Sequence, residues 1–329
     1  MNATRPILSA TPTPDPTPAP VVVGVDGSPS SEAALRWAAA EAMRRGRPLR
    51  IVSVWTIPAA ATTTPLMSGV FVDPAPFEEQ AERSAIAART LVRIELGADA
   101  PEVEVVVVEG FAIDRLVEQS AHGEMLVVGS RGRGGFASLV LGSVADGCVH
   151  HSAVPVVVVR PEGSPVAARD VVVGLDDTEG SMAALRWAAV EAGRLGLRLV
   201  VIHARGVHHA LYPDLEEEFG DLPDVLEATF AANGRRFVDR LLGGMAGTVG
   251  KPSSVSWRIV DEAAPKALLD AAASAALLVV GAHDHGRVTG RLLGSVSRQC
   301  VHHSPCPVVV VPTAPATVAT GESRLLHAS

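Results

Sequence analysis

The chain has 329 residues, 47% of which are hydrophobic, and a formal net charge of −8 at pH 7. Its length suffices for two domains with a hydrophobic core each, while no apolar run reaches the roughly 20 residues that span a bilayer. Basic residues are scattered along the sequence, so we expect neither a nucleic acid nor a membrane among the partners of this chain.

The N-terminal segment and the cysteine content both bear on the location of the protein. Residues 1–19 are rich in proline and threonine and lack the basic start and the apolar stretch of a signal peptide. They predict an extended, disordered arm. The three cysteines, Cys148, Cys300 and Cys306, are too few and odd in number for a disulfide framework. These features favour a cytoplasmic protein.

In the first half of the chain, short runs rich in valine and isoleucine alternate with alanine-rich segments of helical pattern. The runs predict strands at 20–25, 49–54, 103–109, 125–129 and 155–160. The helix after the first strand has Ser30 or Ser31 as its expected N-cap. Strands that alternate with helices in this way indicate a parallel sheet covered on both faces, which is an α/β fold.

The second half of the chain repeats the first. The segments VVVGVD at Val21 and VVVGLD at Val171 lie 150 residues apart, and each is followed by an identical ALRWAA. Strands are predicted at 170–175, 199–204, 254–260, 277–281 and 307–312, and Ser181 is the expected cap of the first helix. The predicted domains are 20–160 and 170–312, with a linker at 161–169 and a tail at 313–329.

A glycine-rich string follows the fourth strand of each half. GSRGRGGFASLVLGS spans Gly129–Ser143, and GAHDHGRVTGRLLGS spans Gly281–Ser295. Backbone N–H groups can converge on phosphate where such a loop leaves a buried strand and enters a helix. The two strings therefore predict two phosphate-binding loops.

Both halves resemble universal stress protein domains, and the whole chain resembles the tandem form of that family. The resemblance is carried by the strand ends Gly24–Asp26 and Gly174–Asp176, the G-x2-G-x9-G-S loop and the closing PVVVV strands. It implies two doubly wound, five-stranded parallel-sheet domains of strand order 3-2-1-4-5, similar to the adenine nucleotide alpha hydrolases. In the ATP-binding branch of the family, it further implies a nucleotide at the carboxyl ends of strands 1 and 4.

The first half has the residues that such a site requires. Asp26 is placed to accept hydrogen bonds from a ribose hydroxyl or the adenine amine, and Gly129 and Gly132 let the backbone approach the ligand. Gly142 and Ser143 would present N–H groups of a helix start to phosphate oxygens. The candidate ligand-binding residues of this half are Gly24, Val25, Asp26, Leu49, Gly129, Arg131, Gly132, Gly142, Ser143 and Val144.

The second half departs from this pattern in its glycine loop. Asp284 occupies the position of Gly132, and two like charges roughly 4 Å apart repel by about 4 kcal/mol at an effective dielectric constant of 20. We therefore expect this half to bind a nucleotide more weakly or to prefer another ligand. Its candidate residues are Asp176, Leu199, Gly281, Gly294, Ser295 and Val296. Leu49 and Leu199, at the start of the second strand of each half, are the predicted wall of the adenine pocket.

The closing strand of each half bears on assembly. In the expected strand order, the valine runs at 154–159 and 306–311 are sheet edges, and an exposed edge of this kind favours aggregation. Pairing of the two fifth strands across a pseudo-twofold axis covers both edges, as in the homodimers of the family. We predict that the two domains dock in this way within one chain. This pairing does not decide whether two whole chains also form a homodimer.

The sequence lacks the signs of a conventional enzyme. It contains neither a recognisable nucleophile–base pair nor the ligand spacing of a metal site, so we expect no catalytic residue and no metal site. The leading hypothesis is a regulator of the stress response that binds ATP, with or without Mg²⁺, and does not catalyse rapid turnover. The alternatives are an interaction scaffold that needs no nucleotide and a slow ATPase or autokinase.

Overall fold

The computed structural model describes residues 18–57, 73–132, 141–161, 168–176, 178–204, 250–282 and 293–313, together with 229, 232, 234, 236–240 and 243. Three predicted segments fall mostly outside the described residues: the arm before residue 18, the linker from 162 to 167 and the tail after residue 313.

The first half contains the five predicted strands, each with its ends within one residue of the prediction. Its elements are β1 (Val21–Gly24), α1 (Pro29–Arg45), β2 (Leu49–Trp55), α3 (Ala75–Leu96), the 3-10 turn η1 (Gly97–Asp99), β3 (Val103–Glu109), α4 (Ala112–Ser120), β4 (Met125–Gly129), α5 (Ser143–His151) and β5 (Val156–Val159).

The second half has the same succession of strands, with ends within two residues of the prediction. Its described elements are β6 (Asp170–Gly174), α6 (Glu179–Leu195), β7 (Arg198–Ala204), β8 (Val255–Val260), α10 (Ala264–Ala272), β9 (Ala275–Gly281), α11 (Ser295–His303) and β10 (Val308–Val311).

The N-caps of the first helix in each half differ from the prediction. Ser28 caps α1, where its Oγ accepts a hydrogen bond from the N–H of Ser31 at 3.2 Å. Thr178 caps α6 in the same way, with Ser181 as the donor at 3.2 Å. The predicted caps Ser30, Ser31 and Ser181 were wrong, because each lies inside the first helical turn. In α1 the start is set by Pro29, since a proline at the first helical position needs no hydrogen-bond partner for its nitrogen.

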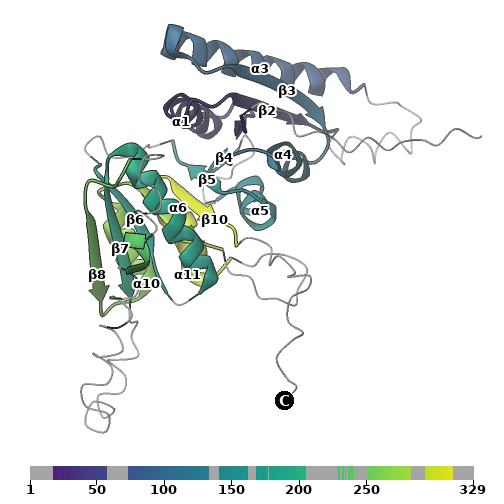
Figure 1. Cartoon of the computed structure of the whole chain (residues 1–329). Coiled ribbons are helices and arrows are strands. Elements are labelled where there is room, and N and C mark those ends of the chain that lie inside the picture. The colour runs from purple at the N-terminus through teal and green to yellow at the C-terminus, as the bar shows by residue number, and fades with distance from the viewer. Residues whose placement is uncertain are drawn as a thin grey trace, which may run out of the picture.

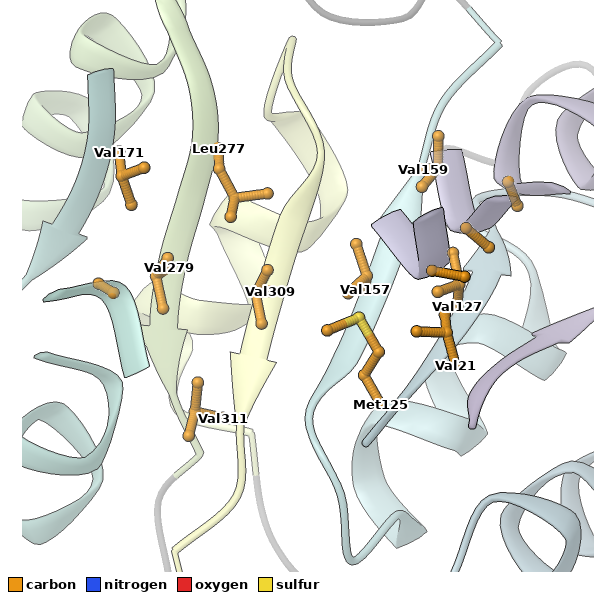
Figure 2. Packing of buried hydrophobic residues seen from close by; sticks show 14 of the residues in the cluster. Val21, Met125, Val127, Val157, Val159, Val171, Leu277, Val279, Val309 and Val311 are labelled. Atoms are coloured by element: carbon orange, nitrogen blue, oxygen red, sulfur yellow. The ribbon is translucent and has the colours of Figure 1, made fainter. Parts of the chain in front are cut away.

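All ten strands form one continuous sheet, in the order β3-β2-β1-β4-β5-β10-β9-β6-β7-β8 (Figure 1). Each half thus has the order 3-2-1-4-5 with parallel neighbours, which confirms the predicted doubly wound fold. The predicted pairing of the fifth strands is also present: β5 and β10 are antiparallel, with Val157 opposite Val309. Figure 2 shows these two valines on the facing strands at the seam between the halves.

The sheet is covered on both faces, and its strands are correspondingly apolar on both sides. Val21 and Val23 of β1 belong to the core beneath α1, α3 and α6, whereas Val22 belongs to the core beneath α4, α5, α10 and α11. All three valines are fully buried. A strand buried on both faces requires a continuous apolar run, which explains why valine runs and not alternating patterns mark these strands.

The three cysteines are buried in the core as free thiols. Burial raises the pKa of the Cys148 thiol to about 12, that of Cys300 to about 12 and that of Cys306 to about 11. The thiolate is the reactive form of cysteine, so these side chains act as packing residues at neutral pH. Within the described part of the chain, no helix combines the length and the apolar character that crossing a membrane requires.

Candidate functional site

A cavity of about 420 Å³ opens at the carboxyl ends of β1 and β4. β1 and β4 are neighbouring strands. β2 lies on the far side of β1 and β5 on the far side of β4, so the strand order reverses between β1 and β4. Ligands of doubly wound sheets bind at this reversal of strand order. We call it cavity 1; the described residues around it are Gly24, Val25, Asp26, Ser31, Val52, Val54, Ala112, Leu116, Val128, Gly129, Arg131, Gly132, Gly142, Ser143, Val144 and Ala145.

Asp26 is held in place by the turn that joins β1 to α1. Its Oδ1 accepts a hydrogen bond from the N–H of Ser28 at 2.9 Å, and its own N–H donates to Ser31 Oγ at 3.4 Å. Ser28 is in turn the N-cap of α1. The carboxylate is therefore positioned at the rim of cavity 1 by the same contacts that begin the helix.

The start of the glycine loop packs directly on α1. A Cβ at Gly129 would lie 2.6 Å from the backbone carbon and oxygen of Ser30, so only glycine allows this approach. The loop is closed by the N–H of Gly142, which donates to the carbonyl of Ser130 at 2.7 Å. A Cβ at Gly132 would lie 2.9 Å from Asp26 Oδ2, which places the loop backbone beside the carboxylate.

The amino end of α5 forms the opposite side of cavity 1. Gly142 is its N-cap, with an extended backbone and no side chain that caps the helix. Gly142, Ser143, Val144 and Ala145 all line the cavity. The positive end of the helix dipole and its first N–H groups therefore face the cavity, an arrangement that suits a phosphate group.

The structure brings the predicted residues of the first half together, with one exception. Gly24, Val25, Asp26, Gly129, Arg131, Gly132, Gly142, Ser143 and Val144 all line cavity 1. The exception is Leu49, which is fully buried and pairs with Val21 at the amino ends of β2 and β1. Since the cavity lies at the carboxyl ends, the assignment of Leu49 to the pocket wall was wrong.

Leu199 requires the same correction in the second half. It is fully buried near the amino end of β7, where it pairs with Val171. The strand-2 walls consist instead of Val52 and Val54 in the first half and of Ile202 and Ala204 in the second. The two-residue period of a strand, combined with the rule that ligands bind at carboxyl ends, would have identified these positions.

Helix α4 supplies a further wall that the sequence analysis missed. Ala112 and Leu116, in its first turns, line cavity 1. A Cβ at Gly24 would lie 2.9 Å from Leu116 Cδ2, so the glycine that ends β1 makes room for this leucine. The remaining lining residues that were not predicted are Ser31, Val128 and Ala145. The cavity thus combines an apolar floor with polar groups at its rim, as small-molecule sites commonly do.

A second cavity of about 420 Å³ lies at the carboxyl ends of β6 and β9. We call it cavity 2. Of the candidates in this half, Asp176, Gly281, Gly294, Ser295 and Val296 line it. Asp284, the predicted difference from the first half, lies outside the described residues.

Two described contacts distinguish cavity 2 from cavity 1. Asp176 Oδ1 accepts hydrogen bonds from both the N–H and the Oγ1 of Thr178, at 3.0 and 2.5 Å. Ser297, where the first half has Ala145, donates from Oγ to the carbonyl of Gly281 at 2.8 Å. The carboxylate of cavity 2 therefore accepts two hydrogen bonds from its own turn. In neither half do the described residues include three or more His, Cys, Asp or Glu side chains grouped to hold a metal ion.

The close approach at Gly129 leads to a test of the loop architecture. Gly129→Ala is expected to lower the free energy of unfolding by about 1 to 3 kcal/mol, because the new Cβ must displace the backbone of Ser30. Gly142→Ala is the matched control: its Cβ would have no neighbour closer than 3.4 Å, so its cost should stay below about 1 kcal/mol. Urea unfolding measures both values, and equal costs would contradict the packing described above.

Comparisons with known proteins support the duplicated organisation. A sequence model of the universal stress protein family matches residues 19–160 and 168–312. A universal stress protein of Mycobacterium tuberculosis is 35% identical over 300 residues, which cover 88% of this chain and 96% of the relative. One of Mycobacterium bovis is 34% identical over 324 residues, 91% of this chain and 97% of the relative.

The fold is also similar to that of solved structures. The crystal structure of a universal stress protein from Archaeoglobus fulgidus has a TM-score of 0.62 and 21% sequence identity, and the similarity covers 89% of this chain and 98% of that one.

Proposed function

Since the chain belongs to the universal stress protein family, in its tandem form, we propose that it is a cytoplasmic, ATP-binding regulator of a stress response. It acts through nucleotide-dependent changes of conformation or association and not through rapid catalysis. The observation that carries the proposal is the convergence of Asp26, Gly132 and the amino end of α5 on cavity 1.

The residues of cavity 1 match the parts of an adenine nucleotide. The apolar side chains of Val52 and Val54 suit the base, and the Asp26 carboxylate is an acceptor for a ribose hydroxyl or the adenine amine. Gly142 and Ser143 offer N–H groups and a hydroxyl to phosphate oxygens. Hydrogen bonds to charged groups contribute roughly 1.5 to 3 kcal/mol each, so a few of them suffice for micromolar affinity, which corresponds to about 8 kcal/mol.

The proposal of binding without rapid turnover rests on the same lining. Among the described residues around cavity 1, Asp26 and Arg131 are the ionisable ones, and Asp26 already holds the turn before α1. The chain's residues thus bind and orient the nucleotide. ATP with or without Mg²⁺ is compatible with this arrangement, because the proposed phosphate contacts come from the backbone and from Ser143.

Cavity 2 is proposed to be an altered site with lower affinity or a different ligand. Asp176 Oδ1 accepts two hydrogen bonds from Thr178, so part of its capacity to accept from a ribose hydroxyl is already used. Ala204, in place of Val54, offers a smaller apolar contact to a base. The predicted effect of Asp284 adds to these differences.

Nucleotide binding is tested directly on the purified full-length chain. We expect ATP or ADP in the denatured protein by mass spectrometry, and calorimetric titration of the nucleotide-free protein with ATP should give one strong site. Gly132→Glu should remove that site, since the new side chain would meet the carboxylate of Asp26. GTP serves as the control ligand for wild type. Protein that carries no adenine nucleotide and releases no heat with ATP would refute the proposal. A time course of ADP formation, with boiled protein as the blank, tests the expected lack of rapid turnover.

A further inference from the structure

A buried group of charged side chains lies where α1 and α6 meet across the seam of the sheet. It consists of Glu41 and Arg45 of α1, Glu124 just before β4, and Glu191 of α6; we call it the interdomain cluster. The exposed fractions of these side chains are 1% for Glu41, 3% for Arg45, 18% for Glu124 and 2% for Glu191. Charged groups are seldom buried to this extent unless they are paired.

Arg45 is the centre of the interdomain cluster. Its Nε donates to Glu41, its Nη1 to Glu124 at 2.7 Å, and its Nη2 to Glu191 of the other half. The guanidinium also lies over the ring of Trp187 in α6, 5.8 Å from its centroid. One arginine therefore joins three carboxylates and an aromatic ring, and two of these four groups belong to the second domain.

The interdomain cluster contains more carboxylates than buried cations. Three carboxylates surround one buried guanidinium, and the other arginines nearby are partly exposed. Of these, Arg44 binds Glu41 from the solvent side, Arg47 and Arg194 bind Glu124, and Arg194 approaches Glu191 to 4.0 Å. The groups that face Glu191 are thus Glu41 and Arg45 of α1 and Arg194 of its own helix, with Glu124 on the far side of Arg45.

Glu41 and Glu191 occupy equivalent positions of the two repeats, and their buried carboxyl groups accept from two different nitrogens, Nε and Nη2, of the same Arg45 guanidinium. An ionised carboxylate only accepts hydrogen bonds, so these two neighbouring carboxyl groups can bond to each other only when one of them carries a proton. Two carboxyl groups that share a buried site generally divide their ionisation in this way. The crowding of two buried carboxyl groups at one guanidinium therefore favours a proton at the contact between the two halves.

We propose that a single proton held between Glu41 and Glu191 is part of the contact that docks the two domains, so that the domains dock more tightly at acidic than at alkaline pH. This inference is independent of nucleotide binding. It concerns the face of the sheet on which α1 and α6 pack, and it uses no residue that lines either cavity.

The surroundings of the two carboxyl groups decide which of them holds the proton. Burial, reinforced by the neighbouring Glu41 carboxylate, raises the pKa of Glu191 to about 8. Burial also acts to raise the pKa of Glu41, but the guanidinium groups of Arg45 and Arg44 outweigh it and lower the pKa. Near neutral pH, Glu191 is therefore the protonated partner and Glu41 the ionised one.

The sign of the pH dependence follows from linkage. A Glu191 side chain released into water returns to its usual pKa near 4.5. The docked, folded state therefore holds one proton more than the unfolded state between about pH 4.5 and pH 8. The contribution of Glu191 to stability is complete below that window, decreases as pH rises through it, and changes no further above it. Because the pKa of Glu41 is lowered, the stability that Glu41 contributes has the opposite pH dependence. This contribution is present above the usual pKa of a glutamate and is lost as pH falls below it.

The two repeats do not contribute equally to the interdomain cluster. Arg45 corresponds to Leu195 in the second half, and Glu124 corresponds to Ala276. A contact between two second-half surfaces would bring two copies of Glu191 together without the central arginine. The interdomain cluster therefore depends on Arg45 and Glu124, which the second half does not repeat.

The test uses Glu191→Gln in the full chain, since glutamine mimics the size and neutrality of the protonated acid. Urea unfolding of this variant and of wild type is compared from pH 5.5 to pH 7.5. The ratio of the unfolding constants, wild type over variant, is expected to rise about tenfold per pH unit, as one linked proton requires. Glu95→Gln is the control, because Glu95 is an exposed partner of Arg36, and it should leave the pH dependence of wild type unchanged.

A spectroscopic measurement keeps the proposal testable if Glu191→Gln folds poorly. At pH 7, the infrared spectrum of wild type should contain the carbonyl stretch of a protonated carboxyl group, and this band should be lost as pH is raised past about 8. Glu41→Gln should fail to reproduce the behaviour of Glu191→Gln, since it breaks the bonds to Arg44 and Arg45. Absence of the band in wild type, or an unfolding ratio that is constant with pH, would overturn the proposal.

Discussion

Replacement of Arg45 by methionine is expected to lower the free energy of unfolding by about 3 to 5 kcal/mol, the usual cost of removing one partner from a buried ion pair. The reason is that Arg45 donates to Glu41, Glu124 and Glu191, and that Glu41 and Glu191 are almost fully buried. Methionine fills much of the volume of the arginine stem but leaves the carboxylates of Glu41 and Glu124 without their central cation and Glu191 without its hydrogen-bond donor. Urea unfolding of wild type and variant at pH 7 measures the difference.

Arg36→Met is the matched control for this experiment. Arg36 lies on the same helix and also binds two carboxylates, Glu32 and Glu95. Its side chain is 47% exposed, however, and surface ion pairs contribute only about 0 to 1 kcal/mol. The contrast between the two variants isolates the effect of burial. A loss for Arg45→Met as small as that for Arg36→Met would show that the interdomain cluster is not a major source of stability.

Replacement of Asp26 by alanine is expected to weaken ATP binding at cavity 1 by roughly 10- to 150-fold, which corresponds to the loss of one hydrogen bond to a charged group. The carboxylate lies at the rim of the cavity beside Gly132, and in the proposed function it accepts a hydrogen bond from the nucleotide. Calorimetric titration with ATP measures the change. Asp176→Ala, the equivalent change at cavity 2, should leave the strong site nearly unaffected.

Asp26→Asn separates the role in binding from the role in folding. Asp26 Oδ1 also accepts a hydrogen bond from the N–H of Ser28 at 2.9 Å, so alanine disturbs the turn before α1 as well as the cavity. Asparagine keeps an oxygen acceptor for Ser28 while it removes the charge. We expect Asp26→Asn to retain most of the stability of wild type and to bind ATP with reduced affinity. If both variants bound ATP as tightly as wild type, Asp26 would have no part in nucleotide recognition.

Local sequence patterns predict some residues of the candidate site and miss others. Asp26, Gly129 and Gly142 were found from the sequence because each belongs to a local pattern: a residue after a strand end, or a glycine at a loop. Val52 and Val54 were missed because both are ordinary valines within a strand, and their place at the carboxyl end matters only once β2 lies beside β1. Leu49 was chosen at the wrong end of the same strand.

The sequence by itself determined the two repeats, the ten strands, their order through the family resemblance, and the pairing of β5 with β10. The strands follow from apolar runs and turn residues, whose effects act over a few neighbours along the chain. The pairing of β5 with β10 follows from the exposed valine edges that this order leaves. Only the tertiary structure decided the walls of the cavities and the interdomain cluster. Arg45 lies 79 residues from Glu124 and 146 residues from Glu191, and no local pattern marks residues that meet at such separations. Their burial and their ion pairs arise because α1 and α6 come together where the two domains dock.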